Sequence, residues 1–389
     1  MAITRRGLIG GCAALALADV LSPRRARAQA AGEIAPAERA AMADIATAFL
    51  KDQGVPGLAV AIADCGRLVY EAGFGFADQA RREKVVPANL FRIASVSKVL
   101  TSVAVFTLIE KGRLTLAAKV FGAGGVLGTD YGTPPYQPFV EDITIEHLLT
   151  HTSGWPKDGP DPMFSHPGLN QAQLISWVLD NTPPTTTPGE AFFLSNFGYS
   201  VLGRVIEKVT GRKYEDYVRA AVLEPCGITD MRIAGNTRAA RVRREVAYYG
   251  EGGADPYRAD VARTDSVGGW IATAGDLVRF ATHLETVLKP ATIATMTTPS
   301  NVSQRRHFVT GWSQFAKGWL ISDGGSWWYN GTITGTSAIL VRTKSCLSWA
   351  ALANSRKNAP HQFQVVQALD KMMWDMARSV KAWEGLSVR

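Results

Sequence analysis

The sequence predicts an α+β fold in which both ends of the chain build one β-sheet and a mostly helical lobe is inserted between them. Strand-like apolar runs occur over residues 57–71 and again between residues 317 and 354. The intervening residues 113–264 carry mainly helix and loop signals and are rich in Gly and Pro from 122 to 190. Strands at both ends with a helical middle favour a single sheet covered by helices.

The elements are expected in a simple order along the chain. Residues 36–54 have helical periodicity, and two apolar runs around a turn at Cys65 predict a β-hairpin. Residues 91–111 predict a long helix that ends at Gly112 and is apolar around most of its circumference, so it should be largely buried. The later segments predict a helix over 276–288, strands over 318–321, 326–329, 336–341 and 347–352, and an amphipathic helix over 360–380.

Length and composition exclude several classes of protein. The chain has 389 residues, of which 46% are hydrophobic and 20% charged, so it can bury a large core and is not disordered throughout. It contains no run of eighteen or more uncharged apolar residues, which excludes a multi-span membrane protein. The net charge is +8, but residues 1–30 carry +4 of it. The charge that remains gives little support for a nucleic-acid partner.

Residues 1–30 have the pattern of an export signal. Arg5-Arg6 is a twin-arginine start, residues 7–18 are apolar, and residues 28–30 offer a small-residue cleavage site, with 26–28 as an alternative. We expect a twin-arginine-type signal peptide and a periplasmic or secreted mature protein. Without cleavage, the same segment would instead anchor the protein to the membrane.

Export would decide which cysteines remain in the mature protein. Cys12 would leave with the signal, so Cys65, Cys226 and Cys346 remain and allow at most one internal disulfide. There is no CxxC pair and no cluster of His and Cys, so the sequence gives no reason to expect a metal site.

A serine and a lysine stand three residues apart in the apolar segment 91–111, as Ser95-Val96-Ser97-Lys98. Residues at this spacing share a helical face, so Lys98 can reach the Ser95 hydroxyl. Serine is a poor nucleophile without an adjacent base, and burial favours the neutral, basic form of lysine. Ser95 is therefore the candidate nucleophile and Lys98 the candidate base. The bare pattern is common, and the alternative is a lysine that extends to the surface.

Further motifs occur in the order found in a known superfamily. They lie at residues 91–98, 145–154, 188–190 with 195–199, 268–277 and 317–319. On these motifs the chain resembles the serine β-lactamases and penicillin-binding proteins, and most of all the branch with class C β-lactamases, D-alanyl-D-alanine carboxypeptidases and related serine esterases. The resemblance covers nearly all of residues 31–389. It implies a β-lactamase/transpeptidase-like fold, with an antiparallel sheet flanked by helices, an inserted helical lobe, and a cleft between the two.

Two positions depart from the family pattern. The second family motif is Tyr-x-Asn, whose tyrosine moves protons between nucleophile and leaving group, but here Leu194 stands in its place before Asn196. The third motif usually begins with Lys or His, but here it is Tyr329-Asn330-Gly331. We hypothesise that Tyr329 supplies the hydroxyl that Leu194 lacks. The alternative is impaired acylation or deacylation, since general acid–base help is worth about 10²–10⁴-fold.

The resemblance also implies how a substrate would be held. The backbone N–H of Ser95 and that of a residue just after Gly331, either Ile333 or Thr334, would form the oxyanion hole. The residues expected to contact the substrate are Leu194, Gly331, Trp155 and Trp328. The group Trp312, Trp319, Trp327 and Trp328 fits either the core of the sheet or an aromatic wall of the cleft.

Three further expectations follow from the family fold. Its first and last strands are antiparallel neighbours, which would bring Cys65 close to Cys346 and allow a disulfide, with Cys226 left free and buried. His151 is expected to brace a loop. Tyr199 is expected to belong to the core and not to the catalytic site.

The sequence thus predicts one serine hydrolase domain over residues 31–389, with a sheet lobe over 31–112 and 265–389 and a helical lobe over 113–264. The expected reaction is acyl transfer to water through a Ser95 acyl-enzyme, with Lys98, Asn196 and Tyr329 as its other catalytic residues. We expect no cofactor, metal or nucleic acid to take part. Carboxylic esters are the first choice of substrate. The alternatives are β-lactam or D-amino-acid peptide hydrolysis, and a pseudoenzyme that only binds cell-wall fragments or a partner protein.

Overall fold

The computed structural model describes residues 34–155, 160–302, 305–308 and 311–383. The expected export signal over residues 1–30 lies outside the described residues and stays a prediction. Within the described ranges, no helix has the length and apolar character needed to cross a membrane.

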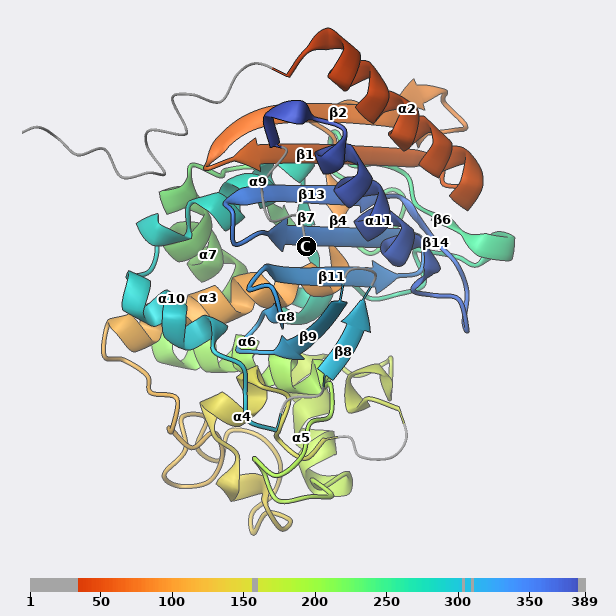
Figure 1. Cartoon of the computed structure of the whole chain (residues 1–389). Coiled ribbons are helices and arrows are strands. Elements are labelled where there is room, and N and C mark those ends of the chain that lie inside the picture. The colour runs from red at the N-terminus through yellow and green to blue at the C-terminus, as the bar shows by residue number, and fades with distance from the viewer. Residues whose placement is uncertain (1–33, 156–159, 303–304, 309–310, 384–389) are drawn as a thin grey trace, which may run out of the picture.

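A nine-stranded sheet forms the centre of the fold, with the strand order β3-β2-β1-β13-β12-β11-β10-β9-β8 (Figure 1). Its strands are β1 (Gly57–Asp64), β2 (Arg67–Asp78), β3 (Glu83–Lys84), β8 (Arg305–Phe308), β9 (Gly311–Phe315), β10 (Leu320–Ser322), β11 (Trp327–Ile333), β12 (Thr336–Arg342) and β13 (Leu347–Ala353). β1 pairs antiparallel with both β2 and β13, so the two ends of the chain meet at β1. The predicted α+β fold, with an antiparallel sheet built from both ends, is confirmed.

The central strands explain why the sequence signals for this sheet were strong. Every residue of β1 and of β13 is buried, because helices cover both faces of the sheet there. Strands covered on both faces are continuous apolar runs, which is the pattern seen in both segments. Shorter strands lie elsewhere: β4 (Phe91–Arg92), β7 (Trp270–Ala272) and β5 (Arg232–Ile233) form one small sheet, and β6 (Tyr249–Gly250) pairs with β14 (Ser355–Arg356).

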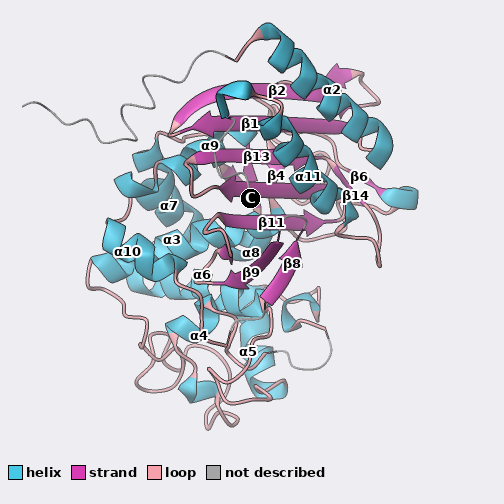
Figure 2. Ribbon diagram, viewed as in Figure 1, coloured by secondary structure: helices cyan, strands magenta, loops and turns pink. Residues whose placement is uncertain are grey.

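Helices cover both faces of the sheet, and helices joined by long loops make up the second lobe (Figures 1 and 2). α2 (Pro36–Gln53) and α11 (Gln364–Arg378) pack against each other across one face, and α9 (Ala274–Thr282) packs against β1 and β13 on the other. The remaining helices are α3 (Ser97–Glu110), α4 (Ile145–Leu149), α5 (Gln171–Asn181), α6 (Asn196–Thr210), α7 (Tyr214–Val218), α8 (Asp265–Gly268) and α10 (Pro290–Thr297).

The helix predicted over residues 91–111 begins later than expected. Phe91–Arg92 forms β4, Ala94–Val96 forms a single 3-10 turn, and α3 starts only at Ser97. Fully buried strands and fully buried helices are both continuous apolar runs, so the sequence pattern did not distinguish the strand β4 from the helix α3. The expected burial is confirmed, because every residue from Ser97 to Leu108 is buried.

A disulfide joins Cys65 and Cys346, two residues 281 positions apart. Cys65 lies in the turn between β1 and β2, and its N–H donates to the carbonyl of Cys346 just before β13, at 3.1 Å. The bridge therefore closes the end of the sheet where the two ends of the chain meet. Cys226 is free and buried. The expected pairing of Cys65 with Cys346 and the expected free, buried Cys226 are both confirmed.

Cys65→Ser is expected to lower the free energy of unfolding by about 2–4 kcal/mol, because the bridge restricts the unfolded chain over a long loop. Urea unfolding of the mature protein without reductant measures this difference. The wild-type protein treated with reductant is the control and should unfold at the lower urea concentration as well. Equal stability of wild type and variant without reductant would contradict the prediction.

Candidate active site

Ser95 lies where the short strand β4 turns into the buried helix α3. β4 pairs with β7, and the N–H of Ile93 donates to the carbonyl of Trp270 at 3.0 Å. Ala94 then takes a φ of 45°, a left-handed conformation that is uncommon for a residue with a Cβ atom. The chain thus enters the 3-10 turn in a fixed direction, and this direction sets the position of the Ser95 side chain.

Lys98 is fully buried, and its Nζ is hydrogen-bonded to Ser95 Oγ at 2.9 Å. Burial lowers the pKa of Lys98 to about 7, although the nearby negative charge of Asp161 acts in the opposite direction. A lysine with this pKa is partly unprotonated at neutral pH, so it can accept the proton of the serine hydroxyl. The structure brings together the nucleophile and the base that the sequence predicts.

The third motif passes directly beside the nucleophile. A Cβ atom at Gly331 on β11 would lie 2.1 Å from the carbonyl oxygen of Ile93 and 2.8 Å from the backbone nitrogen of Ser95. Only glycine allows two backbones to approach so closely. Gly331 therefore acts by letting β11 reach the Ser95 turn. Ile333 and Thr334, the two residues expected to complete the oxyanion hole, line the space in front of Ser95.

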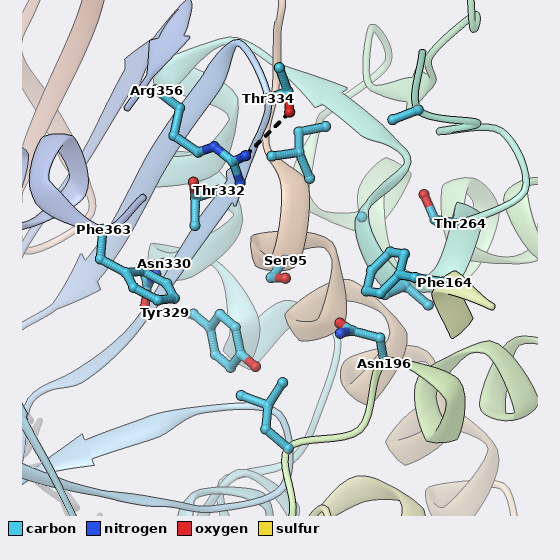
Figure 3. A pocket seen from close by; sticks show the side chains of 15 residues that line it. Ser95, Phe164, Asn196, Thr264, Tyr329, Asn330, Thr332, Thr334, Arg356 and Phe363 are labelled. Carbon is cyan, nitrogen blue, oxygen red and sulfur yellow. Dashed lines mark hydrogen bonds between the residues drawn. The ribbon is translucent and has the colours of Figure 1, made fainter. Parts of the chain in front are cut away.

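A cavity of about 410 Å³ opens in front of Ser95 (Figure 3). Its apolar wall consists of Phe164, Leu194, Ala259, Val267, Ile333 and Phe363, and its polar lining includes Asn196, Thr264, Tyr329, Asn330, Thr332, Thr334 and Arg356. Figure 3 shows Tyr329 and Asn196 on either side of Ser95, each pointing into the cavity. Leu194, Asn196 and Tyr329 thus meet Ser95 in one space, and their roles there stay predictions.

His151 and Ser195 hold the second motif in place. The N–H of Ser195 donates to His151 Nδ1 at 3.1 Å, and the N–H of Phe193 donates to the His151 carbonyl at 2.8 Å. Ser195 Oγ accepts the N–H of Gly198 at 3.0 Å and caps α6. Burial lowers the pKa of His151 to about 3, so its ring stays neutral and can accept a hydrogen bond. The bracing role predicted for His151 is confirmed.

Tyr199 is also placed as predicted. It is fully buried on α6, and its hydroxyl donates to the carbonyl of Leu149 at 2.9 Å. Its ring centre lies 5.9 Å from Lys98 Nζ, so it packs beside the base as part of the core.

Trp155 and Trp328, which were predicted to contact the substrate, are buried and do not line the cavity in front of Ser95. Trp155 is 1% exposed, and its indole N–H donates to the carbonyl of Thr182. Trp328 is 5% exposed, and its indole N–H donates to Ser313 Oγ at 2.9 Å. Neither lines the cavity. Neighbouring residues of a strand point to opposite faces, so Trp328 turns away where Tyr329 turns toward Ser95.

Sequence reasoning missed several residues of the site, including two phenylalanines, an arginine and an aspartate. Phe164 and Phe363 supply aromatic wall, and Arg356 on β14 donates from Nη2 to Thr334 Oγ1 at 3.2 Å. Asp161 accepts the backbone N–H groups of Asn196 and Phe197 at the start of α6. These residues come from three places in the chain: the turn over 161–164, β14, and the residue just before α11. Only Asp161 had a local signal, because Asp-Pro is a typical start of a helical turn.

One group of potential metal ligands comes together in the part of the chain that the structure describes, namely Asp64, Cys65 and Cys346. The two cysteines are joined to each other, so neither offers a thiolate. This group lies at the disulfide end of β1 and is not among the residues that line the cavity.

The comparison with protein families matches residues 42–370 to the beta-lactamase family. The chain belongs to this family. It is thus a member of the β-lactamase and penicillin-binding-protein superfamily of serine hydrolases, as the motifs around Ser95, His151 and Asn196 predict.

Two relatives show how wide this family is. Penicillin-binding protein 4* of Bacillus subtilis is 32% identical over 181 residues, which cover 45% of this chain and 37% of the relative. Esterase EstB of Burkholderia gladioli is 30% identical over 225 residues, which cover 54% of each protein. The matches thus span between a third and just over half of the relatives' own lengths.

Solved structures show the same fold at low identity. The D-amino acid amidase of Ochrobactrum anthropi SV3, complexed with L-phenylalanine amide, has a TM-score of 0.69 at 20% identity, over 87% of this chain and 99% of the amidase. The octameric penicillin-binding protein homologue of Pyrococcus abyssi also has a TM-score of 0.69 at 20% identity, over 88% of this chain and 79% of its own.

Reaction at Ser95 is expected to be lost as the pH falls through about 7, because protonated Lys98 cannot accept the serine proton. Below that pH the apparent second-order rate constant should fall about tenfold per pH unit. The pH profile of kcat/KM for p-nitrophenyl acetate measures this. The Lys98→Met variant is the control and should react slowly at every pH. A wild-type profile that is flat from pH 5 to pH 9 would contradict the assignment of Lys98 as the base.

Proposed function

We propose that the protein hydrolyses carboxylic esters through a Ser95 acyl-enzyme. The observation that carries this proposal is the distance of 2.9 Å between Ser95 Oγ and the Nζ of a buried Lys98, at the base of an open cavity. In acylation, Ser95 Oγ forms a bond to the ester carbonyl carbon while Lys98 takes the hydroxyl proton, and the alcohol leaves with a proton. Water then attacks the acyl-enzyme, which releases the carboxylic acid and restores Ser95.

Two features favour esters over amides. An amine leaving group must be protonated before it departs, whereas an alcohol depends less on proton transfer. Leu194 cannot donate a proton at the position where the family motif has a tyrosine. The wall of the cavity is largely apolar, which suits an acyl chain or a ring. An esterase is also among the relatives of this chain. Hydrolysis of β-lactams or peptide amides is the second candidate, in keeping with the penicillin-binding relative.

One experiment separates these activities from a protein that only binds. The mature protein is incubated with a p-nitrophenyl ester and with a labelled penicillin, and turnover and intact mass are followed together. We expect ester turnover that disappears in Ser95→Ala. A lasting adduct on Ser95 without turnover would indicate a stalled acyl-enzyme. Neither turnover nor adduct would contradict the proposal and leave a binding protein.

We further propose that the Tyr329 hydroxyl works with Lys98 in proton transfer. Tyr329 supports this by its place, because it lines the same cavity as Ser95 and Asn196 and points into it (Figure 3). Its phenol is the one such group that the polar lining offers in place of the tyrosine that Leu194 replaces.

Tyr329→Phe is expected to lower kcat for ester hydrolysis by about 10²-fold, because the variant keeps the ring but loses a general acid–base group. Steady-state kinetics with p-nitrophenyl butyrate measure this. Tyr70→Phe, which removes a phenol on β2 away from the cavity, is the matched control and should leave kcat unchanged. Turnover by Tyr329→Phe within twofold of wild type would contradict the hypothesis.

Arg356 gives the cavity a positive charge and suggests a preference among esters. Its Nη2 is hydrogen-bonded to Thr334, but its buried Nε finds no hydrogen-bond partner among the residues that the structure describes. Burial lowers the pKa of Arg356, because its guanidinium cation is poorly solvated there. We propose that an anionic group of the substrate completes the contacts of this guanidinium.

Arg356→Met is expected to reduce the preference for a carboxylate-bearing ester by about tenfold, since a hydrogen bond to a charged group is worth about 1.5–3 kcal/mol. The comparison is kcat/KM for p-nitrophenyl hemisuccinate against p-nitrophenyl butyrate in wild type and variant. The butyrate serves as the internal control. An unchanged ratio between the two esters would exclude a role for Arg356 in recognition.

We also propose that the mature protein works outside the cytoplasm. The twin-arginine pattern in residues 1–30 and the Cys65–Cys346 disulfide support this, since stable disulfides are typical of exported proteins. Intact mass of the protein recovered from a periplasmic extract would show a chain that starts near residue 31. A full-length chain confined to the cytoplasm would contradict the proposal.

A further inference from the structure

Lys98 is enclosed by groups from several elements, and they differ in charge. His151 packs on the helical-lobe side and is neutral, because burial and the nearby Lys98 lower its pKa to about 3. Tyr199 on α6 stays neutral as well, because burial raises its pKa well above 10. Tyr329 on β11 lines the cavity beside Ser95. Asp161 is the described group whose negative charge acts on Lys98.

The Asp161 carboxylate is held as a hydrogen-bond acceptor. Oδ1 accepts the N–H of Met163 at 2.9 Å and that of Phe197 at 3.2 Å, and Oδ2 accepts the N–H of Asn196. Burial raises the pKa of Asp161, and these three backbone donors together with Lys98 oppose the rise. Because N–H donors occupy both oxygens, the contacts stabilise the ionised form.

Asp161 also connects two parts of the cavity wall. It caps the turn that carries Phe164, and it binds the first two residues of α6, the helix that begins with Asn196. Both Phe164 and Asn196 line the cavity in front of Ser95. A single carboxylate therefore holds the segments of two wall residues, and its negative charge also acts on Lys98.

We propose that Asp161 is a positioning residue for the reaction at Ser95: it anchors Asn196 beside the nucleophile and supplies the negative charge that balances the buried Lys98. This inference rests on the proposed function only in that Ser95 and Lys98 must react as a pair. His151 and Tyr199 are neutral, so neither can replace the negative charge that Lys98 loses without the carboxylate. The protonated form of Lys98 is then less favoured, so the pH at which Lys98 becomes a base falls.

The test follows the labelling of Ser95 by a fluorophosphonate across the pH range, by intact mass. In this reaction Ser95 Oγ forms a bond to phosphorus, fluoride leaves, and the hydroxyl proton passes to Lys98. Labelling needs neither ester binding nor deacylation, so it reads the Ser95–Lys98 pair even if ester turnover is absent. Wild type that is labelled but turns over no ester overturns the proposed function alone.

Asp161→Asn is expected to move the acid limb of the labelling profile down by about one pH unit and to lower the rate on the plateau. Asp180→Asn is the matched control. It removes a helical-lobe carboxylate that accepts the N–H of Thr133 at 2.7 Å, and it should leave the limb unmoved. A purely structural role would lower the plateau of Asp161→Asn without moving its limb, and this result would overturn the proposal.

Asp161→Glu provides a second test if Asp161→Asn does not fold, as judged by circular dichroism and a thermal transition. The longer side chain keeps the charge but displaces the hydrogen bonds to α6. Its limb should stay at the wild-type pH while its plateau falls. A limb displaced by about one pH unit in Asp161→Glu overturns the proposal, and so does a profile identical to wild type in Asp161→Asn.

Discussion

The burial of Lys98 against Ser95 is the constraint on which the rest of the structure depends. An ammonium group removed from water is strongly disfavoured, so the protein keeps this lysine close to neutral, with a pKa of about 7. That burial needs α3 to be enclosed along its whole first part, from Ser97 to Leu108. The enclosure in turn needs the sheet, which exists only because β1 from one end of the chain pairs with β13 from the other.

The close approach of β11 to the turn that carries Ser95 connects the sheet with the candidate catalytic residues. Gly331 permits contact between two backbones, and the same strand carries Tyr329 into the cavity. On the opposite side, His151, Ser195 and Asp161 fix the start of α6 and with it Asn196. Ser95 thus lies between two walls that are held by separate sets of contacts. Such contacts keep a reactive group and its partners in a fixed relative position.

The two residues that differ from the family motifs, Leu194 and Tyr329, line the same cavity. Leu194 adds an apolar side chain to the wall, and Tyr329 places a phenol in the same cavity. We propose that a serine–lysine pair in an apolar cavity lined on one side by Arg356 favours esters with an anionic group over amides. Family membership covers many activities, so this preference is a property of the side chains at this site and not of the fold.

The sequence by itself determined the central strands of the sheet but not β3, β8 or β9, and it also determined the buried helix, the Ser95–Lys98 pair and the bracing histidine. Each of these rests on local periodicity, on a spacing within one turn, or on a family motif. The sequence pattern misplaced the start of α3, because buried strands and buried helices are equally apolar. The sequence analysis also assigned Trp155 and Trp328 to substrate contact, although both are buried.

Only the tertiary structure decided which distant side chains share the cavity. Asp161 and Phe164 come from one turn, Arg356 from β14 and Phe363 from the start of α11, and they meet Ser95 or its neighbours only after the lobes have packed. The charge on Lys98 was decided in the same way, because a pKa depends on how completely a group is enclosed and on which charges face it.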